Sequence, residues 1–127
     1  MRIGVDCDGV LTPFSYSARK LPWLLYLPII FIPSRRTMTE IVRKWAKAGD
    51  EIIIVSARPK ELTGLTKLWL RLHKIPFNQV FCVGLGEGVE SRKLEIAKQQ
   101  RIEILFDDNE CTVRVLRENG IKAILFK

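Results

Sequence analysis

The sequence predicts an α/β fold in which helices cover both faces of a five-stranded parallel sheet. Two observations carry this prediction. Short runs rich in β-branched residues alternate along the chain with longer segments of helical periodicity, which is the pattern of repeated βαβ units. Acidic or hydroxyl residues directly follow three of these runs, as expected where parallel strands end at one edge of a sheet. We therefore expect residues 1–127 to form a single Rossmann-like three-layer sandwich with right-handed crossovers.

The first strand is an apolar run that begins at Ile3 and ends in Asp6-Cys7-Asp8-Gly9. Gly9 is expected to form the turn after the strand, and strand alternation would point Asp6 and Asp8 to one side and Cys7 to the other. Two carboxylates about 4 Å apart repel by roughly 4 kcal/mol at an effective dielectric of 20. Mg²⁺ removes such repulsion and suits carboxylates that share a substrate phosphate. The alternative interpretation is a solvated acidic turn.

Residues 10–36 form an insert that interrupts the alternation, and residues 21–33 within it are apolar throughout. This apolar segment is shorter than the roughly 20 residues that a membrane span needs, and its three prolines argue against a continuous helix. We expect no transmembrane segment. The apolar segment is interpreted first as a lid or a contact between identical subunits, and last as a shallow membrane contact. The alternative is an irregular loop folded onto the core.

Two helices flank the second strand, which is expected at Glu51–Val55. Thr37 and Glu40 have the spacing of a capping box, so the first helix is expected to begin there and to end at Gly49. Pro59 is expected at the first position of the second helix. The predicted buried stripe of that helix consists of Leu62, Leu65, Leu68, Trp69 and Leu72.

The second half of the chain repeats the alternation. A third strand is expected at Gln79–Val83, and Ser91 is expected to cap the next helix. Lys93 would then lie in the first turn of that helix, where a cation opposes the helix dipole. Such a break of a local rule indicates either a functional lysine or an exposed one that is tolerated at small cost. The remaining predicted elements are a strand at Glu103–Phe106, a helix at Glu110–Glu118 that Asn109 caps, and a strand at Ile121–Phe126.

Composition narrows the function classes. The 21 basic and 14 acidic residues give a formal net charge of +7, which favours an anionic substrate or partner, with solubility alone as the alternative. The three cysteines lack metal-ligand spacing, so we expect no zinc site and a reducing cytoplasmic location. We expect no signal peptide, because the N-terminus runs directly into a predicted strand. His73, the single histidine, ends a helix among basic residues and receives no catalytic role.

Six side chains are predicted to meet at or just beyond the strand ends on one edge of the sheet. They are Asp6, Asp8, Ser56, Lys93, Asp107 and Asp108. Four acids, a hydroxyl and a lysine in one cleft suit phosphate chemistry with a metal ion. The set is much more specific than any of its members.

These motifs resemble those of the haloacid dehalogenase (HAD) superfamily, from the first strand to the final helix. Asp6-Cys7-Asp8-Gly9-Val10-Leu11-Thr12 is similar to the first motif, and Phe106-Asp107-Asp108-Asn109 is similar to the fourth. Ser56 in Ser56-Ala57-Arg58-Pro59 is similar to the second motif, and Lys93 stands where the third falls. The resemblance implies a HAD-like core and a phosphatase that forms an aspartyl-phosphate.

The resemblance also implies roles for the acids. Asp6 would be the nucleophile, and Asp8 would protonate the leaving oxygen and then activate water. Asp6, the backbone carbonyl of Asp8, and Asp107 would hold Mg²⁺. Gly9 and Asp108 would support this site, and Asp108 could bind the ion itself. A carboxyl group at position 8 favours a phosphatase or phosphomutase over the transport ATPases of the superfamily, which carry threonine there.

For the substrate, the resemblance implies that Ser56 and the amide of Ala57 hold phosphate oxygens. Lys93 would neutralise the nucleophile and the transferring group. The chain resembles a capless or minimally capped member, somewhat similar to the deoxyribonucleotidase branch, because its inserts are too short for a full cap. The expected substrate is a nucleotide, a sugar phosphate or a similar phosphorylated metabolite. A nucleic-acid end or another macromolecule is the alternative.

A non-catalytic nucleotide-binding module is the rival hypothesis. Gly84, Gly86 and Gly88 follow a strand and Asp107 lies about 20 residues on, as in a dinucleotide-binding fingerprint. The third glycine is misplaced, however, and this interpretation leaves the two acids of the first motif without a role. A phosphoacceptor signalling domain would need an aspartate directly after the third strand, where the sequence has none.

Overall fold

The computed structural model describes residues 1–11, 34–84 and 86–126, and they fold around a five-stranded sheet in the order β3-β2-β1-β4-β5. The strands are β1 (Arg2–Val5), β2 (Glu51–Ser56), β3 (Gln79–Cys82), β4 (Ile104–Asp107) and β5 (Lys122–Leu125). Every neighbouring pair runs parallel. The predicted α/β class and the predicted parallel sheet are therefore confirmed.

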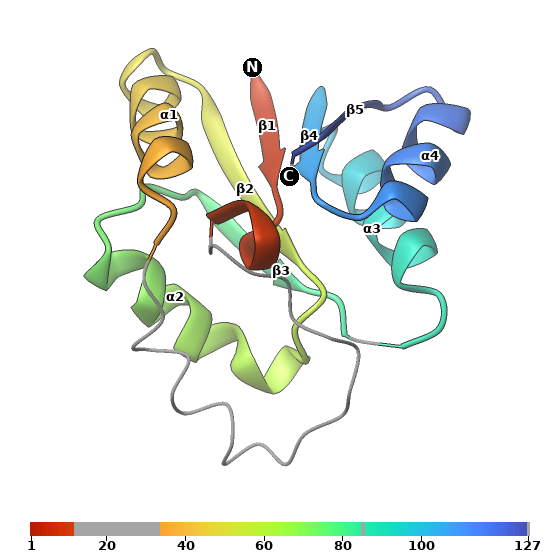
Figure 1. Cartoon of the computed structure of the whole chain (residues 1–127), viewed down its shortest axis with the longest axis horizontal. Coiled ribbons are helices and arrows are strands. Elements are labelled where there is room, and N and C mark those ends of the chain that lie inside the picture. The colour runs from red at the N-terminus through yellow and green to blue at the C-terminus, as the bar shows by residue number, and fades with distance from the viewer. Residues whose placement is uncertain (12–33, 85, 127) are drawn as a thin grey trace.

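Helices cover both faces of the sheet. They are α1 (Arg36–Lys47), α2 (Thr63–Leu72), α3 (Val89–Gln99) and α4 (Glu110–Glu118). Figure 1 shows α1 and α2 on one side of the strands and α3 and α4 on the other. Successive side chains of β2 point to opposite faces of the sheet, as strand alternation requires, and pack in two separate hydrophobic clusters. Ile52 and Ile54 pack in the cluster that contains Trp69 of α2, whereas Ile53 and Val55 pack with Leu116 of α4.

The central strand β1 lies where the chain changes direction across the sheet. Strands β2 and β3 extend the sheet on one side of β1, and β4 and β5 extend it on the other. Gly4 leaves room for neighbouring side chains, because a Cβ at that position would lie 3.1 Å from the side chains of Ile102 and Leu105. The carboxyl ends of β1 and β4 form a topological switch point, which is where open α/β sheets bind ligands.

Two predicted helix starts are wrong. Helix α1 begins at Arg36 after Arg35, which makes no side-chain capping bond, so Thr37 and Glu40 lie inside the helix and form no capping box. Helix α3 begins at Val89 after Gly88, which has a left-handed conformation (φ 82°), so Ser91 is not the cap. The predicted cap of α4 is confirmed, since the side chain of Asn109 accepts from the backbone N–H of Cys111 and of Thr112.

The predicted buried stripe of α2 is correct only in part. A short 3₁₀ turn (Lys60–Leu62) follows Pro59, and the α-helix begins only at Thr63. The buried residues of α2 are Thr66, Trp69 and Leu70, whereas Leu68 is 43% exposed and Leu72 is 58% exposed. The inward face of α2 therefore passes through Thr66, Trp69 and Leu70, and Leu68 and Leu72 lie on the more exposed side.

The apolar segment at 21–33 and most of the insert at 10–36 lie outside the described residues. Their predicted roles as lid, subunit contact or membrane contact therefore stay predictions. Within the described part of the chain, no helix combines the length and the apolar character needed to cross a membrane.

Candidate active site

Asp6 directly follows β1 and lies at the switch point. Its backbone N–H donates to the carbonyl of Phe106 in β4 (2.9 Å), which continues the ladder between the two strands by one residue. Strand alternation stops there, because Cys7–Leu11 form a single π-helical turn that contains Asp8 and Gly9. The N–H of Cys7 donates to the Asp6 carboxylate (2.9 Å). The turn predicted at Gly9 is present. Asp8 lies in this turn and not on a strand, so the predicted strand alternation does not set its direction.

Asp107 and Lys93 meet Asp6 from β4 and α3. Asp107 is the last residue of β4 and is fully buried. Its Oδ2 accepts from Lys93 Nζ at 2.6 Å, and its Oδ1 accepts from the N–H of Asn109 at 2.9 Å. Lys93 Nζ also lies 3.4 Å from Asp6 Oδ1. Lys93 is 2% exposed, so it is not the tolerated surface lysine of the alternative interpretation.

Three carboxylates lie close enough to share one cation. Asp6, Asp107 and Asp108 each offer an oxygen atom, and these atoms lie within 4.8 Å of one another. Oxygen-only donors of this kind fit Mg²⁺, which commonly binds through one or two carboxylates and a substrate phosphate. The structure therefore supplies a donor set that fits the predicted ion, with Asp108 beside Asp6 and Asp107.

Electrostatics in the site are dominated by burial. Burial raises the pKa of Asp6 well above its ordinary value of 3.8, Lys93 opposes this rise, and Asp107, Asp8 and Asp108 add to it. Burial would lower the pKa of Lys93, but Asp6 and Asp107 outweigh this effect and raise it above its ordinary value of 10.5. Lys93 is thus positively charged at neutral pH among several acids. A further cation would relieve the excess of negative groups.

Asp8 is held by a residue to which the sequence analysis gave no role. Arg58 Nη2 donates to Asp8 Oδ1 at 2.7 Å, and Arg58 Nε donates to Asp8 Oδ2 at 2.9 Å. Arg58 is 2% exposed. Burial would lower the pKa of Arg58, but Cys7 and Asp8 outweigh this effect and raise it, so the guanidinium stays charged. Asp8 therefore faces a permanent buried cation.

Ser56 ends β2 beside this pair. It is fully buried, and its Oγ accepts from the backbone N–H of Arg58 at 3.1 Å. Ala57, half-buried, lies between them. The structure thus brings together Asp6, Lys93 and Asp107, with Asp108 beside them, and it joins Asp8 to the Ser56–Arg58 loop. The roles of these residues in phosphate binding and catalysis stay predictions.

Sequence reasoning missed Arg58 and its partner Thr66. Arg58 Nη1 donates to Thr66 Oγ1 at 3.1 Å, and Thr66 is fully buried. An arginine next to a proline after a strand is typical of an exposed turn, and a threonine within a helix gives no chemical signal. The one usable sign was Thr66 itself, a polar residue on the stripe that also contains Trp69 and Leu70.

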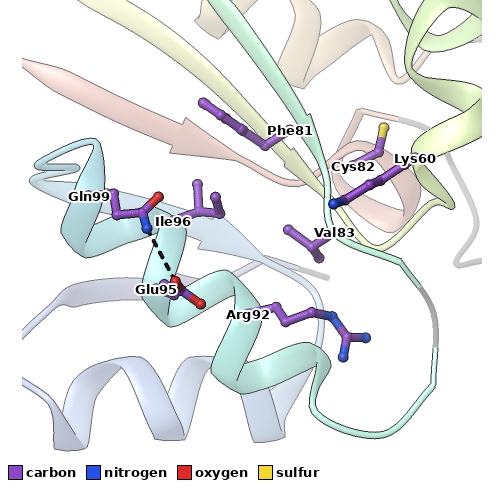
Figure 2. A pocket seen from close by; sticks show the side chains of 8 residues that line it. All are labelled: Lys60, Phe81, Cys82, Val83, Arg92, Glu95, Ile96 and Gln99. Atoms are coloured by element: carbon purple, nitrogen blue, oxygen red, sulfur yellow. Dashed lines mark hydrogen bonds between the residues drawn. The ribbon is translucent and has the colours of Figure 1, made fainter.

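A pocket of about 280 Å³ lies between β3 and α3 (Figure 2). It is lined by Lys60, Phe81, Cys82, Val83, Arg92, Glu95, Ile96 and Gln99. None of the acids of the candidate site lines it. Its polar groups are largely engaged with the protein, since Arg92 donates to the carbonyls of Glu87 and Gly84, and Gln99 donates to Glu95. The pocket and the acid cluster are therefore separate features of the described residues.

Sequence comparisons point to nucleotidases. No protein-family model matches the chain. A nucleotidase from Clostridium acetobutylicum is 28% identical over 91 residues, which cover 72% of this chain and 44% of that protein. A putative nucleotidase from Halalkalibacterium halodurans is 28% identical over 87 residues, which cover 68% of this chain and 42% of that protein. The chain thus spans less than half the length of these curated relatives.

Solved structures support the fold. A chain of the Pnkp1/Rnl/Hen1 complex superimposes with a TM-score of 0.79 at 16% identity, over 98% of this chain and 45% of that one. The D,D-heptose 1,7-bisphosphate phosphatase of B. bronchiseptica, crystallised with magnesium and phosphate, gives a TM-score of 0.68 at 11% identity. That match covers 98% of this chain and 79% of the phosphatase. These likenesses show the fold, which is the HAD-like Rossmann fold that the sequence predicts, with the acids of the first and fourth motifs at the switch point of its sheet.

Proposed function

We propose that this chain is a Mg²⁺-dependent phosphomonoester hydrolase that forms an aspartyl-phosphate on Asp6. One observation carries the proposal: Asp6 lies at the switch point within 3.4 Å of the buried Lys93 ammonium and beside Asp107 and Asp108. A carboxylate next to a fixed cation and a candidate metal site is what nucleophilic attack on a phosphate dianion requires. The names of the nucleotidase relatives support the same reaction class.

The chain's own side chains would hold the ion. Asp6, Asp107 and Asp108 offer carboxylate oxygens, and the backbone carbonyl of Asp8 is the further ligand expected from the family resemblance. Bound there, Mg²⁺ would offset the repulsion between the nucleophile and the phosphate and would orient the transferring group.

In the first step, an Asp6 oxygen attacks phosphorus and the ester P–O bond breaks. Asp8 gives its proton to the leaving oxygen, so the alcohol departs neutral. Lys93 lies 3.4 Å from Asp6 and 2.6 Å from Asp107, and it offsets negative charge as the phosphoryl group transfers. Ser56 and the Ala57 amide would bind phosphate oxygens.

In the second step, water attacks the phosphorus of the aspartyl-phosphate. Asp8, now a carboxylate, takes the proton of that water as the P–O bond to Asp6 breaks. Inorganic phosphate leaves, and both carboxyl groups return to their starting states. Asp8 thus acts once as an acid and once as a base.

A nucleotide is the substrate that we propose first. Both curated relatives carry the name nucleotidase, and they match 72% and 68% of this chain. The net charge of +7 suits an anionic substrate.

A phosphorylated nucleic-acid end is the second candidate. Two of the structural neighbours come from the Pnkp1/Rnl/Hen1 complexes, one of which is described as an RNA repair complex. A surplus of seven positive charges also suits a polyanion. The rival hypothesis of a dinucleotide-binding module gains nothing from the geometry, because the Asp107 carboxylate that it needs for a ribose is buried against Lys93.

An aryl phosphate assay tests the reaction class. Wild type should release phosphate only with Mg²⁺, and Asp6→Asn should abolish turnover. Asp50→Asn is the matched control, since Asp50 pairs with the N-terminal amine and precedes β2 at the opposite end of the strands. Hydrolysis that persists in Asp6→Asn, or wild type that never turns over, would contradict the proposal.

A substrate panel tests the two candidates. Nucleoside monophosphates, sugar phosphates and oligonucleotides with a terminal phosphate should be compared by kcat/KM at equal ionic strength. Preference for the monophosphates supports the first candidate, and preference for the oligonucleotides supports the second.

A further inference from the structure

We propose that Arg58 is a positioning residue that fixes the orientation of the Asp8 carboxylate for both proton transfers. This inference rests on the proposed function. Arg58 meets both oxygens of Asp8 through two different nitrogens, at 2.7 Å and 2.9 Å. A guanidinium that binds a carboxylate in this two-point way fixes the plane of the carboxylate as well as its distance.

Asp8 needs such a partner because the sheet does not orient it. Strand β1 ends at Val5, and Asp8 lies in the π-helical turn that follows. A side chain on that turn lacks the neighbours that a pleated strand would give it. The guanidinium supplies the missing restraint from the loop after β2.

Arg58 is itself held from three sides. Its third side-chain nitrogen, Nη1, donates to Thr66 Oγ1 of α2 at 3.1 Å. Its backbone N–H donates to Ser56 Oγ at 3.1 Å, and its carbonyl accepts from the N–H of Gly84 at 3.0 Å. Through Arg58, Asp8 is therefore connected to β2, to α2 and to the loop after β3.

The same contacts argue against a direct role for Arg58 in substrate binding. All three guanidinium nitrogens already donate to protein oxygens, and the residue is 2% exposed. A substrate phosphate would have to displace Asp8 or Thr66 to reach it. Arg58 thus acts through Asp8.

The kinetics of Arg58→Lys test the proposal. Lysine keeps the charge and loses the two-point contact, so kcat should fall on the order of 10- to 100-fold while KM stays nearly constant, since small displacements of a catalytic group have effects of this size. Asp8→Asn should lower kcat further, by about 10²- to 10⁴-fold. Thr66→Val, which removes only the outer contact, should give a smaller loss than Arg58→Lys.

The double variant distinguishes positioning from a general structural role. If Arg58 acts through Asp8, Arg58→Lys should have no further effect on kcat in the Asp8→Asn background. Arg43→Lys is the matched control, because Arg43 also donates from two nitrogens, here to the carbonyls of His73 and Lys74 after α2. This control should keep the wild-type kcat.

The outcomes for the positioning role of Arg58 can be distinguished from those for the proposed hydrolase function. Effects of Arg58→Lys and Asp8→Asn that multiply, or a rise in KM at constant kcat, would overturn the positioning role. So would an unchanged kcat in Arg58→Lys and in Thr66→Val, each confirmed as folded by circular dichroism. Failure of the proposed function is seen separately, as wild type without Mg²⁺-dependent turnover.

Discussion

Asp6 shows how a buried acid in a candidate active site can oppose stability. It lies buried beside Asp8, Asp107 and Asp108, and burial raises its pKa above 3.8. Without a metal ion, the folded protein therefore binds the Asp6 proton more tightly than the unfolded chain does. As the pH rises from 3.8 through the folded-state pKa, ionisation of Asp6 lowers the free energy of unfolding.

Asp6→Asn should be more stable than wild type at pH 7 in EDTA, by about 1 kcal/mol, a gain typical of relieved functional sites. Asparagine keeps the shape without the charge, and Lys93 keeps its 2.6 Å contact with Asp107. The gain should shrink as the pH falls toward 4, because wild type then carries the proton. Urea unfolding at a series of pH values measures this. A variant less stable than wild type at pH 7 would contradict the electrostatic account.

At the residue scale, the sequence predicts which acids and which lysine meet, and it misses their supports. Lys93 was singled out because its predicted place in the first turn of a helix would break a local rule. That placement is wrong, since α3 begins at Val89 and Lys93 is its fifth residue, yet the structure buries Lys93 between Asp6 and Asp107. Arg58 could not be found, because burial of an arginine depends on a partner 50 residues away. Long-range pairing of this kind leaves no local pattern.

Helix α2 carries a direct test of the corrected stripe. Leu70 is fully buried in the core with Trp69, whereas Leu72 is 58% exposed. Leu70→Ala should lower the free energy of unfolding by about 2–5 kcal/mol, as buried leucine truncations do. Leu72→Ala should change it by less than about 0.5 kcal/mol. Equal losses in urea unfolding would support the stripe predicted from the sequence.

At the element scale, helix existence is predictable and helix starts are less so. Asn109 was found because its side chain caps its own helix through bonds two and three residues away. The start of α3 was missed because Gly88 leads into the helix with a left-handed backbone (φ 82°) and no side chain marks it. Cap-type residues such as Ser91 and Thr37 lie inside helices, where sequence alone does not distinguish them.

At the scale of the whole molecule, the alternation of strands and helices predicts the edge of the sheet at which the candidate site lies, and the strand order comes from the structure. A parallel sheet whose order reverses beside its central strand has one switch point, and the acids after β1 and β4 meet there. The net charge of +7 belongs to the same scale, because its field acts on any anion that approaches the cluster.

The charge predicts a dependence on salt that also separates the substrate candidates. Between ionic strengths of about 0.01 M and 0.15 M the Debye length falls from roughly 30 Å to 8 Å, so kcat/KM for a nucleoside monophosphate should fall several-fold while kcat changes little. An oligonucleotide that contacts the surface through several phosphates should show a steeper fall, because each neutralised phosphate adds to the salt dependence. Steady-state kinetics across this range, with an uncharged osmolyte as the control, measure both slopes. Equal slopes would mean that only the terminal phosphate is recognised, and kcat/KM independent of salt would show that the surplus charge serves solubility and does not guide the substrate.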